Sequence, residues 1–202
     1  MIGIVTGDIT KSRRIPSSTW VTAFKDVLAS IGNNPSKWEL YRGDEFQLEV
    51  RPEDALLTVI RIKAFLKTLK LDARMSIGIG DKSYSAEKIT ESNGTAFIRS
   101  GELFEKLRNE KLTLAINTGS ADFDYELNLM LRLSTSIMNN WLPQSGEFVR
   151  TAIEHRNLSQ EEIGALLGIN QAAVSRRQKR SQFELIMEVE SYFRNKIKTV
   201  TE

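Results

Sequence analysis

The chain of 202 residues has room for one large domain or two small ones, and its 41% hydrophobic and 27% charged residues are ordinary for a protein that buries a core. It has no cysteine and one histidine, which excludes disulfides and thiolate metal sites and argues against a zinc site or a histidine-based triad. The formal net charge of +2 says little about partners, because a nearly neutral chain can still carry one basic face.

The N-terminal segment places its apolar run before its basic residues, the reverse of a secretory signal. No apolar run approaches the roughly 18 residues that a membrane span needs. We therefore expect a cytoplasmic protein that has no membrane partner.

Short apolar runs alternate with amphipathic stretches through the first part of the chain. The apolar or alternating runs predict strands at residues 2–9, 38–41, 46–50, 74–80 and 112–116. The amphipathic stretches predict helices from Ser17 or Ser18 to about residue 30, from Pro52 to about residue 69, and from about residue 96 to 107. This order predicts an α+β fold, with helices packed on a ferredoxin-like sheet.

A long helix is expected from Asp122 to Trp141, and the Leu-Pro-Gln-Ser-Gly segment that follows it makes the best domain boundary. Everything after that boundary is predicted to be helical. The expected organisation is a sheet domain at residues 1–120, a connecting helix at 121–142 and an all-α domain at 143–202.

The all-α domain carries a helix-turn-helix pattern. Ser159 stands three residues before Glu162, the spacing of a capping box that starts a helix. Gly168 is expected to end that helix, and Asn170 can cap the next one. The inner face of the first helix is expected to be Ile163, Leu166 and Leu167.

The second helix of the pattern suits a recognition helix, whose N-terminus enters the major groove while flanking cations contact phosphates. The residues expected to bind DNA are Gln171, Ala172, Ser175, Arg176, Arg177, Lys179 and Arg180. The alternative is a solvated basic helix that never contacts DNA. Small residues such as Gly164, Ala165 and Ala173 permit the close helix crossing of a helix-turn-helix, so we predict DNA as a partner.

The last helix has one apolar side that admits two interpretations, packing within the module or a dimer seam. Its residues are Phe183, Ile186, Met187, Glu190, Phe193 and Ile197. A homodimer is expected, because paired half-sites multiply a weak single-module affinity.

Acidic residues at two places of the predicted sheet could converge. Asp8 ends the first strand, and Asp44 and Glu45 lie in the hairpin turn, which a ferredoxin-like sheet places beside that strand. Convergent carboxylates bind Mg²⁺ or Mn²⁺ and can present the ion to a triphosphate. The structural alternative is that Asp8 caps a helix and that Gly-Asp-Glu is only a turn.

The loop after the first strand combines backbone N–H groups with positive charge and leads into a helix N-terminus, an arrangement suited to phosphates. The expected nucleotide- or phosphate-binding residues are Ile9, Lys11, Ser12, Arg13 and Arg42.

These motifs resemble nucleotide cyclases. Asp8-Ile9 resembles the metal-binding Asp-Ile of class III cyclases, residues 42–46 (Arg-Gly-Asp-Glu-Phe) are similar to the hairpin signature of GGDEF-type cyclases, and residues 76–80 (Ser-Ile-Gly-Ile-Gly) resemble the strand that follows. Ile98 and Glu102 stand where class III cyclases keep an asparagine and an arginine for the transition state. The resemblance therefore implies metal and phosphate binding without the standard cyclase chemistry.

Taken with the terminal helix-turn-helix, the motifs resemble the SatD family over nearly the full chain. The resemblance implies this architecture in a bacterial protein. From the motifs themselves we expect a DNA-binding transcriptional regulator whose degenerate cyclase-like domain senses a nucleotide together with Mg²⁺ or Mn²⁺. One alternative is a metal-dependent nucleotidyltransferase or cyclase that the helix-turn-helix localises. A second is an interaction module that uses its helix-turn-helix for protein contact.

Overall fold

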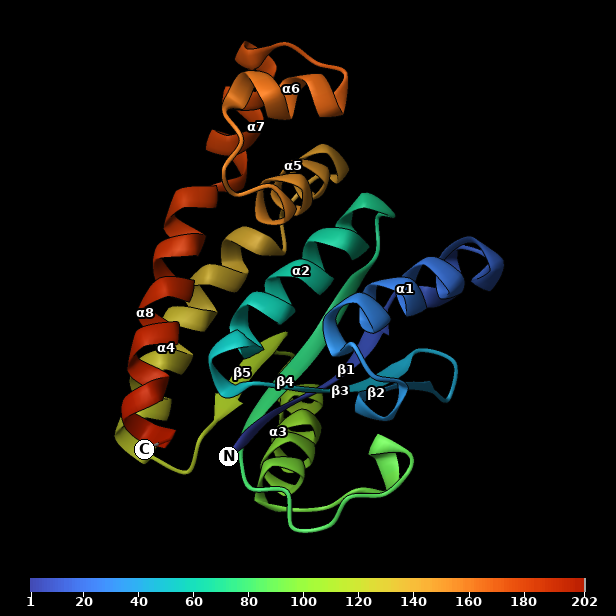
Figure 1. Cartoon of the computed structure of the whole chain (residues 1–202), viewed down its shortest axis with the longest axis vertical. Helices are drawn as coiled ribbons and strands as arrows, with labels where there is room; N and C mark the ends of the chain where they lie inside the picture. Colours follow the sequence, from blue (N-terminus) through green and yellow to red (C-terminus); the bar gives the residue numbers. More distant parts are fainter. Residues whose placement is uncertain (202) are drawn as a thin grey trace.

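The computed structural model describes residues 1–201 of the chain, as one five-stranded mixed sheet with eight α-helices (Figure 1). The strands are β1 (Ile2–Thr10), β2 (Trp38–Tyr41), β3 (Glu45–Val50), β4 (Asp72–Gly80) and β5 (Leu114–Asn117). The helices are α1 (Ser17–Gly32), α2 (Ala55–Thr68), α3 (Thr95–Glu110), α4 (Ala121–Met138), α5 (Pro143–Glu154), α6 (Gln160–Leu167), α7 (Gln171–Ser181) and α8 (Phe183–Thr201). The α+β class expected from the sequence is confirmed, and the predicted strands and helices lie within a few residues of their observed bounds.

The strands lie in the order β2-β3-β1-β4-β5, with antiparallel neighbours except for the parallel pair β4–β5. Asp8 on β1 lies opposite Glu45 on β3 and Arg74 on β4. Directly opposed residues of antiparallel strands project from the same face. The register therefore gathers three charged side chains on one face at the end of β1.

Helices cover both faces of the sheet. Alternate residues of β1 show this, because Val5 belongs to a large buried cluster with Phe24 of α1, whereas Ile4 belongs to a second cluster with Phe97 of α3. Asn128 of α4 covers the edge strand, since its side-chain amide donates to the carbonyl of Ile116 and accepts from its N–H, both at 2.9 Å. That contact removes a pairing edge that another chain could otherwise join.

The C-terminal helices pack back onto the sheet layer. In Figure 1, α5 lies against α2, and α8 runs beside α4. Ile186, Phe193 and Ile197 of α8 are at most 2% exposed and belong to the same buried cluster as the sheet and α2. The apolar side of the last helix is therefore packed within the chain, and the dimer-seam interpretation of that side is wrong.

A buried charge cluster joins α2 to β4 and to the end of α4. Asp72 binds the ammonium groups of Lys63 and Lys67 at 2.5 and 2.7 Å, and Lys67 also donates to the carbonyl of Asn139 at 2.5 Å. Lys63 is only 1% exposed. Within residues 1–201, no helix is long and apolar enough to cross a bilayer.

Candidate functional site

The carboxylate of Asp8 is half-buried at the end of β1. Its Oδ2 lies 3.9 Å from Nη1 of Arg74, and its Oδ1 is buried without a hydrogen-bond partner in the described part of the chain. Burial raises the pKa of Asp8 despite the nearby charges of Arg74 and Arg108, and the carboxylate of Asp44 raises it further. A divalent cation would stabilise a buried carboxylate that has an unused oxygen and a second carboxylate nearby.

The other two predicted metal ligands are held by other groups. Ser12 Oγ donates to Oδ2 of Asp44 at 2.7 Å, and Glu45 Oε2 lies 3.6 Å from Nη1 of Arg42. Among residues 1–201, no group of three or more histidine, cysteine, aspartate or glutamate side chains is arranged to hold a metal. The three carboxylates therefore do not form a complete protein cage, although Asp44 lies close enough to Asp8 to raise the pKa of Asp8.

A cavity of about 350 Å³ opens where the loop after β1 meets the β2–β3 hairpin and the start of α1. Its lining residues are Ser12, Arg13, Ile15, Pro16, Ser17, Trp20, Arg42, Gly43 and Asp44. Four of the predicted site residues, Ser12, Arg13, Arg42 and Asp44, thus share one cavity with the N-terminus of α1. A helix N-terminus and two guanidinium groups make this cavity suitable for an anion.

Ser17 and Trp20 also line that cavity and were not predicted as site residues. Trp20 is 2% exposed, and its Nε1–H has no hydrogen-bond partner among the described residues. A buried indole donor normally has a partner, so this group is available to an acceptor. The one sequence signal that could have indicated Trp20 was its position in the first turn of the helix that follows the loop.

One of the predicted phosphate-binding residues, Ile9, is placed differently from the expectation. Ile9 is 1% exposed, and its N–H donates to the carbonyl of Asp44 at 2.9 Å, so it has no free donor for a phosphate. Lys11 is exposed, with a left-handed backbone conformation (φ 66°), and its role with phosphates stays a prediction. The N–H of Ile9 is unavailable because its hydrogen bond joins β1 to the hairpin turn at Asp44.

The expected caps of α6 and α7 are present. Ser159 Oγ accepts from the N–H of Glu162 at 3.3 Å, and the Glu162 carboxylate accepts from the N–H of Ser159 at 2.7 Å. Asn170 Oδ1 accepts from the N–H of Ala173 at 2.9 Å and so caps α7. Leu166, expected on the inner face of α6, is 56% exposed, whereas Ile163 on the same helix is buried.

The residues predicted to bind DNA fall into two groups on α7. The exposed group is Gln171, Ala172, Arg176, Lys179 and Arg180, and none of its three cations has an ion pair within residues 1–201. Ser175 is half-buried. Arg177 is 20% exposed and binds Glu147 of α5 at 2.5 Å, so it fixes α7 to α5.

Ile98 and Glu102, the two residues that the resemblance to cyclases aligns with transition-state residues, lie on α3. Ile98 is 51% exposed, and Glu102 is exposed. A glutamate would repel the negative charge that develops during nucleotide cyclisation, and an isoleucine offers it no hydrogen bond. These side chains do not supply the chemistry for which cyclases use these positions.

Comparison with known proteins gives the family of the chain. No curated protein is similar enough to match. The model of the SatD family matches residues 2–201, which is nearly the whole chain, and the protein therefore belongs to the SatD family.

Proposed function

We propose that the protein is a bacterial DNA-binding transcriptional regulator that contacts DNA through α7. The observation that carries this proposal is the exposed cationic face of Arg176, Lys179 and Arg180 on a helix whose first residues, Gln171 and Ala172, are also exposed. Cations further along a recognition helix can contact phosphates while its first residues reach base edges in the major groove.

The way α6 and α7 are joined supports the same proposal. Gly168 ends α6 in a left-handed conformation (φ 64°), and Asn170 caps α7 two residues later. Val174 anchors α7 with 0% exposure, whereas Gln171, Arg176 and Lys179 are exposed. A short turn between two capped helices, with the second anchored by one apolar residue, is what a helix-turn-helix requires.

Salt-dependent binding to duplex DNA tests this part of the proposal. Arg176→Ala with Lys179→Ala should weaken binding to every sequence and reduce the slope of log K against log salt by about two, because two phosphate contacts are lost. Lys106→Ala, which removes an exposed cation from α3, is the matched control and should change neither quantity.

Wild-type protein that binds no duplex DNA at low salt would refute the proposal. A double variant with an unchanged slope would favour a protein-contact role for the helix-turn-helix.

The sheet layer is, in this proposal, a degenerate cyclase-like domain that senses a nucleotide. The order β2-β3-β1-β4 with antiparallel neighbours is the arrangement of a ferredoxin-like sheet and supports the cyclase-type interpretation. Asp8 and Asp44 would hold Mg²⁺ or Mn²⁺ together with the phosphates of the nucleotide, since Mg²⁺ is often bound by one or two carboxylates plus phosphates. Arg13, Arg42 and the α1 N-terminus would hold those phosphates.

Thermal unfolding with a panel of ribonucleotides, each with and without Mn²⁺, tests the sensing role. A ligand at about 100 times its Kd should stabilise the wild type by about 2.7 kcal/mol, and Asp8→Asn should abolish the metal-dependent part. Glu188→Gln, an exposed position on α8, is the control. A flat panel with wild type would refute nucleotide sensing and leave the DNA-binding role standing.

The second candidate is a metal-dependent nucleotidyltransferase or cyclase that the helix-turn-helix localises. The unpartnered carboxylate oxygen of Asp8 favours it, and the exposed Ile98 and Glu102 oppose it. It requires metal-dependent consumption of a triphosphate that Asp8→Asn abolishes, and the absence of product from any of the four ribonucleotides excludes it.

The proposal also includes a homodimer, because two recognition helices read paired half-sites. Light scattering at several protein concentrations tests this state, and a mass that stays monomeric in the presence of DNA would exclude it.

A further inference from the structure

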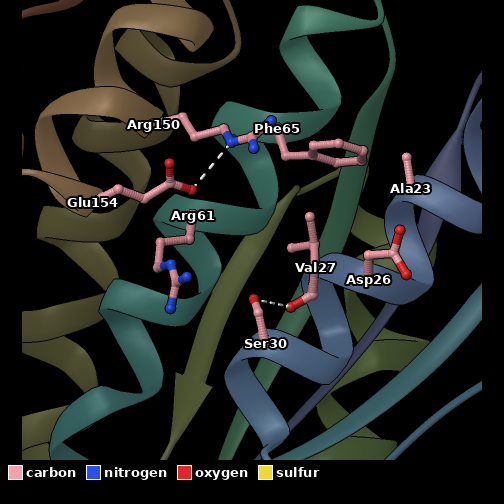
Figure 2. A pocket seen from close by; sticks show the side chains of 8 residues that line it. All are labelled: Ala23, Asp26, Val27, Ser30, Arg61, Phe65, Arg150 and Glu154. Atoms are coloured by element: carbon pink, nitrogen blue, oxygen red, sulfur yellow. Dashed lines mark hydrogen bonds and ion pairs between the residues drawn. The ribbon is translucent and has the colours of Figure 1, made fainter. Parts of the chain in front are cut away.

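Two adjoining cavities form a groove between α1 and α2. The first, of about 400 Å³, is lined by Ala23, Asp26, Val27 and Ser30 of α1, Arg61 and Phe65 of α2, and Arg150 and Glu154 of α5 (Figure 2). The second, of about 450 Å³, shares Ser30 and Arg61 with the first and continues toward Gly32 and Lys37. Both volumes lie in the range of small-molecule sites, and no residue of the groove belongs to the cavity near Asp8.

Arg61 is the cation of this groove that lacks a carboxylate partner. The other cations that line it are paired, Arg150 with Glu154 at 3.1 Å, Lys37 with Glu49 at 3.3 Å, and Arg51 with Asp54 at 2.7 Å. Arg61 is half-buried and has no ion pair within residues 1–201. In Figure 2 the carboxylate of Asp26, on the opposite wall, is turned away from Arg61.

The surroundings of Arg61 favour an added anion. Burial lowers the pKa of Arg61, Glu154 opposes that shift, and the neighbouring cations Arg150 and Arg156 lower the pKa further. A half-buried guanidinium with cationic neighbours is stabilised by a carboxylate or phosphate, whose two oxygens match its paired N–H donors.

The wall beside Arg61 places a guanidinium plane next to an aromatic ring. Phe65 lies one helical turn further along α2, and the guanidinium carbon of Arg150 lies 5.8 Å from the centre of its ring. Figure 2 shows Arg150 reaching from α5 toward this ring, with Val27 of α1 across the gap. The ring is only 5% exposed and stacks on Phe24, whereas the side chain of Arg150 is 46% exposed. The guanidinium plane of Arg150 is therefore the surface on which a flat group can stack.

We propose that this groove binds a small organic anion whose carboxylate or phosphate is held by Arg61 and whose flat apolar part stacks on the guanidinium of Arg150, beside Phe65. The site is independent of DNA binding and of nucleotide binding near Asp8. Because its walls come from α1, α2 and α5, a bound anion would contact both the helices on the sheet and the first helix of the C-terminal region.

Calorimetric titration with three probes tests the site, namely 4-bromobenzoate, 4-bromophenyl phosphate and inorganic phosphate. We expect at least one of the two aromatic probes to bind the wild type. The probe that binds more tightly shows whether the groove prefers a carboxylate or a phosphate. Inorganic phosphate should bind at least tenfold more weakly than the better aromatic probe, because it has no flat group to stack on Arg150. In a soaked crystal, the bromine should lie beside Phe65.

Variants locate the binding. Arg61→Gln should weaken the aromatic probe at least tenfold, Arg61→Lys should give an intermediate loss, and Arg132→Gln, at an exposed arginine of α4, should give none. Urea unfolding checks that each variant is folded. The proposal is overturned if the wild type binds neither aromatic probe, if Arg61→Gln binds as tightly as the wild type, or if the bromine lies outside the groove.

Discussion

Replacing Asp72 by asparagine should be among the most destabilising single changes of a polar side chain in this protein. Asp72 holds two ammonium groups, with Lys63 at 2.5 Å and 1% exposed, and Lys67 at 2.7 Å and 9% exposed. An amide of the same shape keeps the packing but leaves both cations buried without a counter-charge. Breaking a buried ion pair in this way costs about 3–5 kcal/mol, which for a chain of this size lowers Tm by roughly 6–20 °C.

The stability lost in the Asp72→Asn variant should decrease as the pH rises. Burial lowers the pKa of Lys63 below its ordinary value of about 10.4, and Asp72 opposes that shift. Without the carboxylate, the pKa of Lys63 falls further. The unfolded chain then binds more protons than the folded one over the pH range between the two pKa values, which ends at about pH 10. Stability then rises with pH. The Asp72→Asn variant should therefore regain stability as the pH approaches 10, and more steeply than the wild type.

Urea unfolding at pH 7 and pH 9.5 measures both effects. Asp26→Asn, at an exposed position of α1, should change the free energy of unfolding by less than about 0.5 kcal/mol. Adding Lys63→Met to Asp72→Asn removes one uncompensated cation and should recover about 1 kcal/mol or more. A loss under about 1 kcal/mol at pH 7, or a loss that is the same at both pH values, would show that the buried charges are not the cause.

Two further pairs of variants test close packing and helix capping, with calorimetric Tm as the measurement. Gly78→Ala should cost more than about 2 kcal/mol, because its Cβ would lie 2.2 Å from the carbonyl oxygen of Ala96, whereas Gly101→Ala, with open space around it on α3, should gain up to about 1 kcal/mol. Ser159→Ala should cost about 1 kcal/mol by removing the cap of α6, and Ser120→Ala, at an N-cap without a side-chain hydrogen bond, should cost much less. Equal losses within either pair would contradict these explanations.

The sequence predicted the elements whose signals are local. The apolar run of β1, the alternation of β4 and the caps Ser159 and Asn170 depend on neighbours a few positions away, and the structure places these elements as expected. The strand order also brings Asp8 opposite Glu45, next to the turn that carries Asp44, whereas metal binding by these residues stays a prediction.

Features that depend on packing between distant segments could not be predicted in this way. The period of α6 put Leu166 inside, but a helix of eight residues buries only the side that α7 covers, and Leu166 lies beyond it. The groove around Arg61 is built by three helices that are far apart in the sequence, so no spacing indicates it. We expected the N–H of Ile9 to be free for a phosphate. Its acceptor is the carbonyl of Asp44, which is distant in the sequence, so no local pattern indicated this hydrogen bond.

The segment around Leu142 and Pro143 changes the chain direction without separating the two halves mechanically. Gly146 of α5 lies so close to α2 that a Cβ there would be 2.5 Å from the carbonyl oxygen of Ala64. The indole of Trp141 donates to the carbonyl of Ser181 at 2.9 Å, which fixes the end of α7 to the same region. A signal from a ligand in the sheet layer to α7 would therefore pass through packed side chains of α5, and the ion pair between Glu147 and Arg177 is the polar contact through which α5 would transmit it.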